Sequence, residues 1–275
     1  MSIREQYPAG VPCWVETLLS DPRAATTFYR SLLGWEFSEP EPMAGGLGGE
    51  YYVAHVDGHA VAGIGTLPPL GGPPTAVWST SIRVESADRL VELATTAGAS
   101  VMLGPLAVGS AGRWAVLVDP TGAAFGAWEA CDREGAQLVN QPGTWTMSAL
   151  HTPDPTAAAT FYGAVFGWEA EPIAAEAPVT VFRLAGYIGG EPGQPIPRDV
   201  VAVMTATASG PNGPSVPPHW NVNLRVDDSD AIAARAAELG GTLLMGPMDT
   251  PGFRSAVLMD PQGAAFSVSH IVRGK

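Results

Sequence analysis

An acidic side chain in an otherwise apolar strand is the first feature of chemical interest in this sequence. The segment Val11 to Leu19 is predicted to be a strand, and Glu16 shares one of its faces with Trp14 and Leu18, because alternate residues of a strand point the same way. A carboxylate held between such neighbours is desolvated, and its pKa rises into the range useful for general acid or base catalysis. Glu16 is therefore the candidate catalytic residue.

The same carboxylate also has a structural interpretation. Glu16 could be the partner of an arginine, Arg83 or Arg113, and stabilise the fold as an ion pair. The sequence leaves both interpretations open.

A polar row near the other end of the chain is the second candidate. His219, Asn221, Asn223 and Arg225 alternate with apolar residues, so they share one face of a strand predicted over Trp220 to Val226. Facing inward, this row would offer a ligand several hydrogen bonds; the alternative is a face open to solvent, above all at its Arg225 end. The five histidines include no pair with metal-ligand spacing on one helix.

The elements that must position these residues come in two copies. The segment Phe28 to Glu36 (FYRSLLGWE) returns about half a chain later as Phe161 to Glu169 (FYGAVFGWE). Asp119 to Phe125 (DPTGAAF) returns as Asp260 to Phe266 (DPQGAAF). The chain is therefore a tandem duplication, and we predict one domain over residues 1–135 and a second over 136–275.

Each copy contains the same series of elements twice. After the first strand, Asp21 is a natural N-cap with Pro22 at the first helical position, and the helix is expected to end at Gly34. The Asp57-Gly58 turn between two β-rich runs indicates a hairpin. The full series predicts strands at 11–19, 51–56, 59–65, 78–84, 101–103, 114–118 and 124–128, with a helix at 87–97; the second copy has strands at 145–150 and 220–226 and helices at 155–165 and 229–239.

This order amounts to four βαβββ modules in an α+β fold. Two stretches are expected to lie outside the modules. Residues 130–143 are polar, include Pro142-Gly143 and are predicted to link the copies; the long segment 189–218 is rich in Pro and Gly and is predicted to be a loop.

Composition excludes several classes of partner. With 14 basic and 27 acidic residues the net charge is −13, which disfavours nucleic acid and anionic membrane surfaces. No apolar run approaches the length of a membrane span, and the N-terminus lacks the apolar core of a signal peptide, so a cytoplasmic location is expected. Two cysteines are too few for a disulfide framework. We expect a small-molecule ligand and a monomer or homodimer.

The Ser-Asp-Pro, Phe-Tyr and Leu-Leu-Gly-Trp opening, the module order and the Asp-Pro-x-Gly-Ala-x-Phe closing strand resemble the vicinal oxygen chelate superfamily. This group includes glyoxalases, bleomycin-resistance and fosfomycin-resistance proteins and extradiol dioxygenases. More narrowly, the chain is similar to actinobacterial two-domain proteins described as hydroxylase-like or glyoxalase-like. The resemblance implies two domains, each with a curved sheet enclosing a cavity, but fold alone does not fix function.

Metal-dependent members of that superfamily place His or Glu at set positions on the cavity faces. The corresponding positions here hold side chains that are not ligands of zinc, iron, nickel or manganese: Trp14, Ser79, Gly126, Met147, Asn221 and Ser267. The resemblance therefore implies a cavity without the family's metal, and we expect neither metal nor cofactor.

The cavity faces should hold the ligand. Several tryptophans on strands would favour flat, apolar compounds through stacking. The second copy has Ala149 where the first has Glu16, so only the first keeps an acid. The candidate ligand-binding residues are Trp14, Trp78, Ser79, Arg83, Trp145, Met147, His219, Asn221 and Asn223.

Three functions are compatible with these residues. The first is a metal-independent enzyme in which Glu16 moves a proton during an isomerisation, cyclisation, elimination or hydration of an aromatic metabolite, as in natural-product metabolism. The second is a binding protein that sequesters an antibiotic or metabolite. The third, a metal-dependent glyoxalase or dioxygenase, requires that module pairing bring Glu16 beside His219 or His270; the sequence does not decide whether module 1 pairs with module 2 or with module 4.

Overall fold

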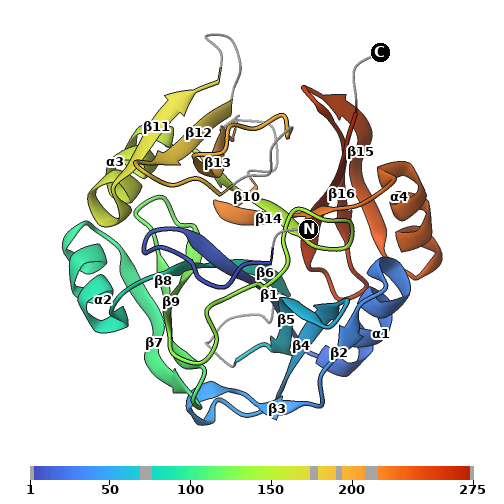
Figure 1. The fold of residues 1–275 in the computed structure, drawn as a ribbon, viewed down its shortest axis with the longest axis horizontal. Helices are drawn as coiled ribbons and strands as arrows, with labels where there is room; N and C mark the ends of the chain where they lie inside the picture. Colours follow the sequence, from blue (N-terminus) through green and yellow to red (C-terminus); the bar gives the residue numbers. More distant parts are fainter. Residues whose placement is uncertain (1–2, 69–75, 174–178, 190–193, 208–215, 273–275) are drawn as a thin grey trace.

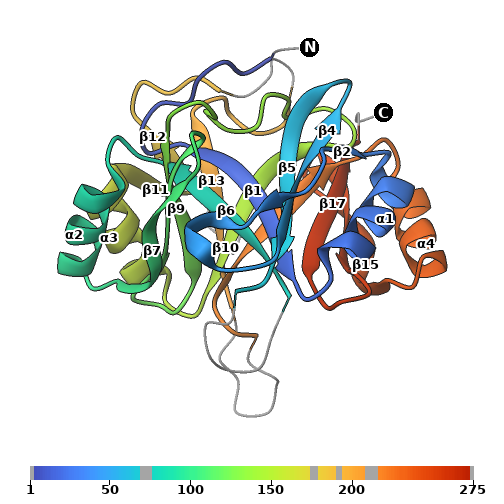
Figure 2. The same cartoon turned by 90° about the horizontal axis from the view of Figure 1, so that it is seen from below.

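The computed structural model describes residues 3–68, 76–173, 179–189, 194–207 and 216–272. Its elements form two mixed sheets, one for each copy of the repeat, with the helices gathered at two flanks (Figures 1 and 2). The predicted α+β architecture of four βαβββ modules is confirmed. Among the described residues, no helix is both long and apolar enough to span a bilayer.

The first sheet is built by modules 1 and 2. Module 1 contains β1 (Pro12–Leu19), α1 (Pro22–Leu33), β2 (Glu36–Phe37), β3 (Glu41–Pro42), the short 3₁₀ helix η1 (Ala44–Gly46), β4 (Glu50–Val56) and β5 (His59–Thr66). Module 2 contains β6 (Val77–Arg83), α2 (Ala87–Thr96), β7 (Ser100–Val108), β8 (Gly112–Val118) and β9 (Ala124–Ala130). The strand order is β2-β4-β5-β1-β6-β9-β8-β7, with β3 paired to β4.

The second sheet repeats this plan with modules 3 and 4. Its elements are β10 (Trp145–Thr152), α3 (Pro155–Phe166), β11 (Trp168–Pro172), β12 (Val179–Leu184), β13 (Val200–Ala206), β14 (His219–Arg225), α4 (Ser229–Glu238), β15 (Thr242–Thr250), β16 (Phe253–Met259) and β17 (Ala265–Ile271). The order β11-β12-β13-β10-β14-β17-β16-β15 matches the first sheet strand for strand.

Local sequence sets the first helix of each copy. Asp21 accepts a hydrogen bond from the Ala24 amide at 2.9 Å, Pro22 begins α1, and Gly34 ends it in the left-handed conformation at a φ of 74°. Asp154 and Gly167 cap α3 in the same way. The boundaries predicted for the first helix at Asp21 and Gly34 are therefore confirmed.

Module pairing is decided by the sheets. Strand β1 lies antiparallel to β6, with Glu16 opposite Ser79, and β10 pairs with β14 in the same manner. Each sheet is therefore made within one copy, by modules 1 and 2 or by modules 3 and 4. Modules 1 and 4 meet instead through their helices: α1 packs near α4 at one flank, and α2 packs near α3 at the other (Figure 1).

The two motifs that are repeated in the sequence contact each other across the copies. Tyr29 of α1 donates a hydrogen bond to Asp260 at 3.0 Å, and Tyr162 of α3 donates one to Asp119 at 2.9 Å. All four of these side chains are buried. The other oxygen of each aspartate accepts backbone amides of its own turn, so each carboxylate joins a turn in one copy to a helix in the other.

Trp78 belongs to this contact between the copies and not to a cavity, contrary to the sequence-based expectation. Its indole N–H donates to the Tyr29 hydroxyl at 3.0 Å, and its ring packs edge-on against Tyr29, near Trp35 and Phe266. The reason is strand periodicity: Ser79 and Ser81 face the cavity side of β6, so Trp78 must face the other side.

Residues 130–143 connect β9 to β10 and pack against the first copy: the Ala136 amide donates to the Cys13 carbonyl at 2.8 Å, and Leu138 is fully buried. One further prediction was wrong. The predicted loop 189–218 contains β13, a strand in the interior of the second sheet. Parts of that predicted loop, 190–193 and 208–215, lie outside the described residues.

Candidate functional site

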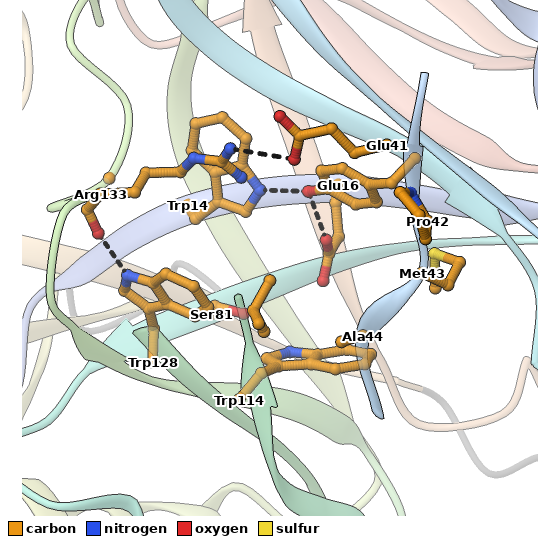
Figure 3. Close-up of a pocket in the computed structure, with 13 residues that line it drawn as sticks. Trp14, Glu16, Glu41, Pro42, Met43, Ala44, Ser81, Trp114, Trp128 and Arg133 are labelled. Carbon is orange, nitrogen blue, oxygen red and sulfur yellow. Dashed lines mark hydrogen bonds and ion pairs between the residues drawn. The ribbon is translucent and has the colours of Figure 1, made fainter. Parts of the chain in front are cut away.

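A cavity opens on the inner face of the first sheet, around Glu16 (Figure 3). Its walls come from β1, β4, β6, β7, β8 and β9, from the segment 41–44, and from the stretch after β9. The lining residues are Trp14, Glu16, Glu41, Pro42, Met43, Ala44, Tyr51, Ser81, Val108, Trp114, Trp128, Arg133 and Gly135.

Glu16 is held by a directed chain of hydrogen bonds. The Trp14 indole N–H donates to the Tyr51 hydroxyl oxygen at 2.8 Å, and the Tyr51 hydroxyl donates to Glu16 Oε2 at 2.7 Å. Because an indole N–H can only donate, the hydroxyl hydrogen of Tyr51 must point at the carboxylate. These two hydrogen bonds fix one oxygen of the Glu16 carboxyl group.

The surroundings of Glu16 favour its neutral form. Only 6% of the residue is exposed, and burial raises the pKa of its carboxyl above the ordinary value of 4.5, although the Tyr51 hydrogen bond and the Arg133 charge oppose the shift. A carboxyl poised this way can take up and release a proton nearer to neutral pH than an exposed glutamate.

Tyr51 reaches Glu16 because the neighbouring strand has no side chains in its path. A β-carbon at Gly63 would lie 1.9 Å from the Tyr51 hydroxyl oxygen, and one at Gly65 would lie 2.8 Å from the Tyr51 ring. In the second copy the register places Val203 and Thr205 at these positions and Val179 at the position of Tyr51. The Glu16–Tyr51 pair is therefore a feature of the first copy alone.

Arg133 brings a positive charge to the mouth of this cavity. Its guanidinium carbon lies 5.8 Å from the centre of the Trp14 ring, and it forms an ion pair with Glu41 at 3.8 Å. Sequence reasoning missed Arg133 because it placed this stretch in a linker. The available signal was an arginine in a polar segment that follows directly on a cavity strand.

The arginines considered as partners of Glu16 bind other carboxylates. Arg83 forms an ion pair with Glu134 at 3.5 Å and lines a separate surface depression, so it does not act as a ligand-binding residue of the Glu16 cavity. Arg113 pairs with Asp88 and, at 3.7 Å, with Glu129. The ion-pair interpretation of Glu16 is thus replaced by a hydrogen bond from a tyrosine.

The other predicted ligand-binding residues lie at separate places. Ser79 is half-buried opposite Glu16 on β6, while its neighbour Ser81 lines the cavity. Trp145 and Met147 line a second cavity at the junction of the two copies, together with Arg4, Tyr7 and Tyr187.

His219, Asn221 and Asn223 do share one face of β14, but the side-chain oxygens of both asparagines and Nδ1 of His219 already have partners in the protein. Asn221 and Asn223 accept hydrogen bonds from Ser267 and Ser269 of β17 at 2.7 and 2.9 Å. His219 stacks on His151 with ring centres 4.8 Å apart. Burial, followed by the charge of His219, lowers the pKa of His151 to about 4, so His151 is neutral near pH 7.

The superfamily's metal does not fit the residues present. The ligand positions hold an indole, a thioether, hydroxyls, an amide and a glycine, none of which supplies the imidazole and carboxylate donors that a divalent transition metal needs. His219 stacks on His151, His270 accepts a hydrogen bond from the Ser229 amide at 3.0 Å, and neither histidine lines the Glu16 cavity. In the described part of the chain, no three His, Cys, Asp or Glu side chains form a possible metal site.

Comparison with known proteins agrees with this fold over nearly the whole chain. Residues 14–127 match the family model of the glyoxalase/bleomycin resistance protein/dioxygenase superfamily, and residues 135–269 match that of the glyoxalase-like domain. A putative glyoxylase, CFP32, of Mycobacterium tuberculosis is 40% identical, with 98% of this chain and 97% of that protein aligned. The anthracycline biosynthesis protein DnrV of Streptomyces peucetius is 34% identical, with 98% and 96% aligned.

Solved structures share the fold at low sequence identity. The Mn(II)-bound glyoxalase of Novosphingobium aromaticivorans is 17% identical and superposes with a TM-score of 0.62 over 95% of this chain and 82% of its own. The 2,3-dioxygenase LapB of Pseudomonas sp. KL28 is 11% identical, with a TM-score of 0.58 over 95% and 93%. With its four modules, its two cavity-forming sheets and these full-length relatives, the chain belongs to the glyoxalase/bleomycin resistance protein/dioxygenase superfamily.

Proposed function

We propose that the first-copy cavity binds a planar, mainly apolar metabolite and that Glu16 exchanges a proton with it without the help of a metal. The reaction class is an isomerisation, cyclisation, elimination or hydration. In each of these, a proton is taken from one atom, of the substrate or of an attacking water, and a proton is delivered to another, of the substrate or of the departing group. One residue that both accepts and donates a proton is sufficient for this.

The observation that carries the proposal is the buried Glu16 carboxyl with one oxygen fixed by Tyr51. Burial raises the pKa of Glu16, and Tyr51 engages Oε2, so the other oxygen, Oε1, is left for a substrate. Trp14, Trp114 and Trp128 supply flat apolar walls around it.

The relatives support the substrate class. Proteins named for anthracycline biosynthesis align over nearly the entire chain, which favours a role in natural-product metabolism. The fold neighbours include enzymes that act on aromatic compounds, but their identity is too low to carry over a reaction.

The test uses a simple aryl ketone, 1-indanone, whose carbon-bound protons next to the carbonyl exchange with solvent only when an acid or base assists. We expect the protein to accelerate deuterium incorporation from D₂O, measured by NMR, and Glu16→Gln to lose roughly 10²–10⁴-fold of that acceleration. Glu36→Gln, an exposed carboxylate of β2 outside the cavity, is the matched control and should keep the wild-type rate.

The alternative function is sequestration of a metabolite or antibiotic. It is favoured by the fact that Glu16 is already bonded within the protein, as a structural carboxyl would be. Binding of aryl ketones with no acceleration of exchange, or an unchanged rate in Glu16→Gln, would reject the catalytic role and support sequestration.

A further inference from the structure

One tryptophan of the eight lacks a hydrogen-bond partner for its indole N–H. All eight lie in the described part of the chain, and seven of them donate to an oxygen at distances between 2.6 and 3.2 Å: Trp14, Trp35, Trp78, Trp128, Trp145, Trp168 and Trp220. Trp114 is the exception, because its Nε1 is buried and has no acceptor within the described residues. Buried N–H groups are nearly always paired, so this one needs an explanation.

Trp114 lines the Glu16 cavity. It is 6% exposed on β8, and it lies beside Ala44 across the cavity from Trp14 and Glu16 (Figure 3). Its register partner Trp128 lines the same cavity but satisfies its own N–H by donating to the Arg133 carbonyl at 2.7 Å. The residue that carries the unpaired donor therefore lines the ligand cavity and is not part of the aromatic packing between the copies.

The second copy does not repeat this donor. The register of β16 and β17 places Ser255 at the position of Trp114 and Ser269 at that of Trp128. The unpaired indole thus occurs in the same copy as the Glu16–Tyr51 pair, and both differ from their counterparts.

We infer that the Trp114 N–H binds a carbonyl oxygen of the ligand, so that the ligand is an aryl ketone or quinone. This inference rests on the proposed function, since it concerns the same cavity, but it names the polar group that the ligand must carry. An indole N–H is a donor only, so its partner must be an acceptor. A ketone oxygen in the plane of a flat ring system accepts hydrogen bonds in that plane while the ring faces stay against the aromatic walls.

Trp114 is accordingly a specificity residue. A ligand of the same shape without the carbonyl would fill the cavity and leave the N–H unpaired, which weakens its binding. The residue need not take part in proton transfer, so its effect is expected on affinity.

The test compares 9-fluorenone with fluorene, two tricyclic compounds of nearly the same shape that differ by one carbonyl oxygen. Affinity is measured by equilibrium dialysis, so that the removal of a tryptophan does not change the signal. We expect wild-type protein to bind fluorenone roughly tenfold more tightly than fluorene, as one added hydrogen bond allows. Trp114→Phe removes part of an aromatic wall as well as the donor, so it should weaken fluorenone more than fluorene and abolish this preference.

Trp128→Phe is the matched comparison, since it also removes an indole from the wall of this cavity, but one whose N–H is already paired. It should change the affinity for both compounds alike, so that the ratio of the two affinities stays at the wild-type value. Glu16→Gln should also keep it, even though it loses proton transfer. Circular dichroism and melting temperature establish that each variant is folded.

The assignment of Trp114 would be overturned if wild-type protein bound the two compounds equally, or if the preference survived in Trp114→Phe. The catalytic proposal would not be affected by either result, because the deuterium exchange of 1-indanone tests it separately. Loss of the preference in Trp128→Phe as well would also count against a specific role. If neither compound binds, the aromatic ligand class itself is wrong, and both proposals fail together.

Discussion

Glu16 lies between a hydroxyl that stabilises its charge and indole walls that cannot solvate it. Burial is the larger influence on its pKa, and the Tyr51 hydrogen bond and the Arg133 charge oppose it without reversing it. A carboxyl in this state carries a cost in stability whenever it ionises. The stability of the protein as a function of pH reports this cost, and it can be measured without knowing the substrate.

We predict that Glu16→Gln raises the stability of the protein, increasingly so at higher pH. The folded-state pKa of Glu16 lies above its unfolded value, so its contribution to stability is full below about pH 4.5 and is lost as the pH rises through the folded-state pKa. Glutamine does not titrate and can still accept the Tyr51 hydrogen bond. The melting temperatures of both proteins, measured from pH 5 to 9, should diverge by about 2–4 °C for each kcal/mol of desolvation relieved.

A lower melting temperature of Glu16→Gln at every pH would contradict this account. It would indicate a carboxylate whose charge is needed by a buried cation, as in the ion-pair interpretation.

At the scale of the elements, β5 allows Tyr51 to reach Glu16 because two residues of this strand have no side chain. Gly63 and Gly65 leave the inner face of this strand bare, and the Tyr51 side chain of β4 lies over it to meet Glu16 on β1. Three adjacent strands are therefore needed for one hydrogen bond. The equivalent strand of the second copy is filled by Val203 and Thr205, which accounts for the absence of a similar pair there.

We predict that Gly63→Ala displaces Tyr51 and lowers the rate of 1-indanone exchange by about ten- to hundredfold, because a hydrogen bond to an ionisable group is lost. A double-mutant cycle with Tyr51→Val provides the control. If Gly63 acts only by making room for Tyr51, then Gly63→Ala should have little further effect in the Tyr51→Val background. Fully additive effects would show that Gly63 acts by another route.

At the scale of the whole molecule, the two copies share a core. Tyr29 stacks on Trp35 and meets Trp78 edge-on, and Tyr162 relates to Trp168 and Trp220 in the same way. Each tyrosine hydroxyl accepts from a tryptophan of its own copy and donates to an aspartate of the other. None of these tyrosines and tryptophans lines the Glu16 cavity or the second cavity, which indicates a structural role.

We predict that the chain unfolds in a single transition and that residues 1–135 and 136–275 do not fold when separated, since each would expose these aromatic rings. Tyr29→Phe or Tyr162→Phe should cost at least about 1–3 kcal/mol, because it leaves a buried carboxylate and an indole N–H without their partner. Differential scanning calorimetry measures both effects. Tyr52→Phe is the control, as its hydroxyl bonds to the half-exposed Glu50. Two separate calorimetric transitions would contradict a shared core.

Local patterns in the sequence determined most of the elements. The caps at Asp21 and Asp154, the glycines at the helix ends and the Asp57-Gly58 turn involve residues a few positions apart, so their geometry is set by neighbours along the chain. The repeated sequence motifs showed that the chain is a duplication. The alternation of side chains along a strand placed Trp14 and Glu16 on one face. Strand β13 was missed because the Pro- and Gly-rich segments beside it indicated a loop.

The partners of those residues were decided only by the tertiary structure. Tyr51 is 35 positions from Glu16, and Asp260 is 231 positions from Tyr29, so no local pattern could pair them. Which face of β6 carries Trp78, which modules form a cavity and which indole N–H lacks an acceptor depend on strand register and on how the sheets associate. Sequence alternation specifies that a strand has two faces, but only the packing of all the strands decides which face is the cavity and which is the core.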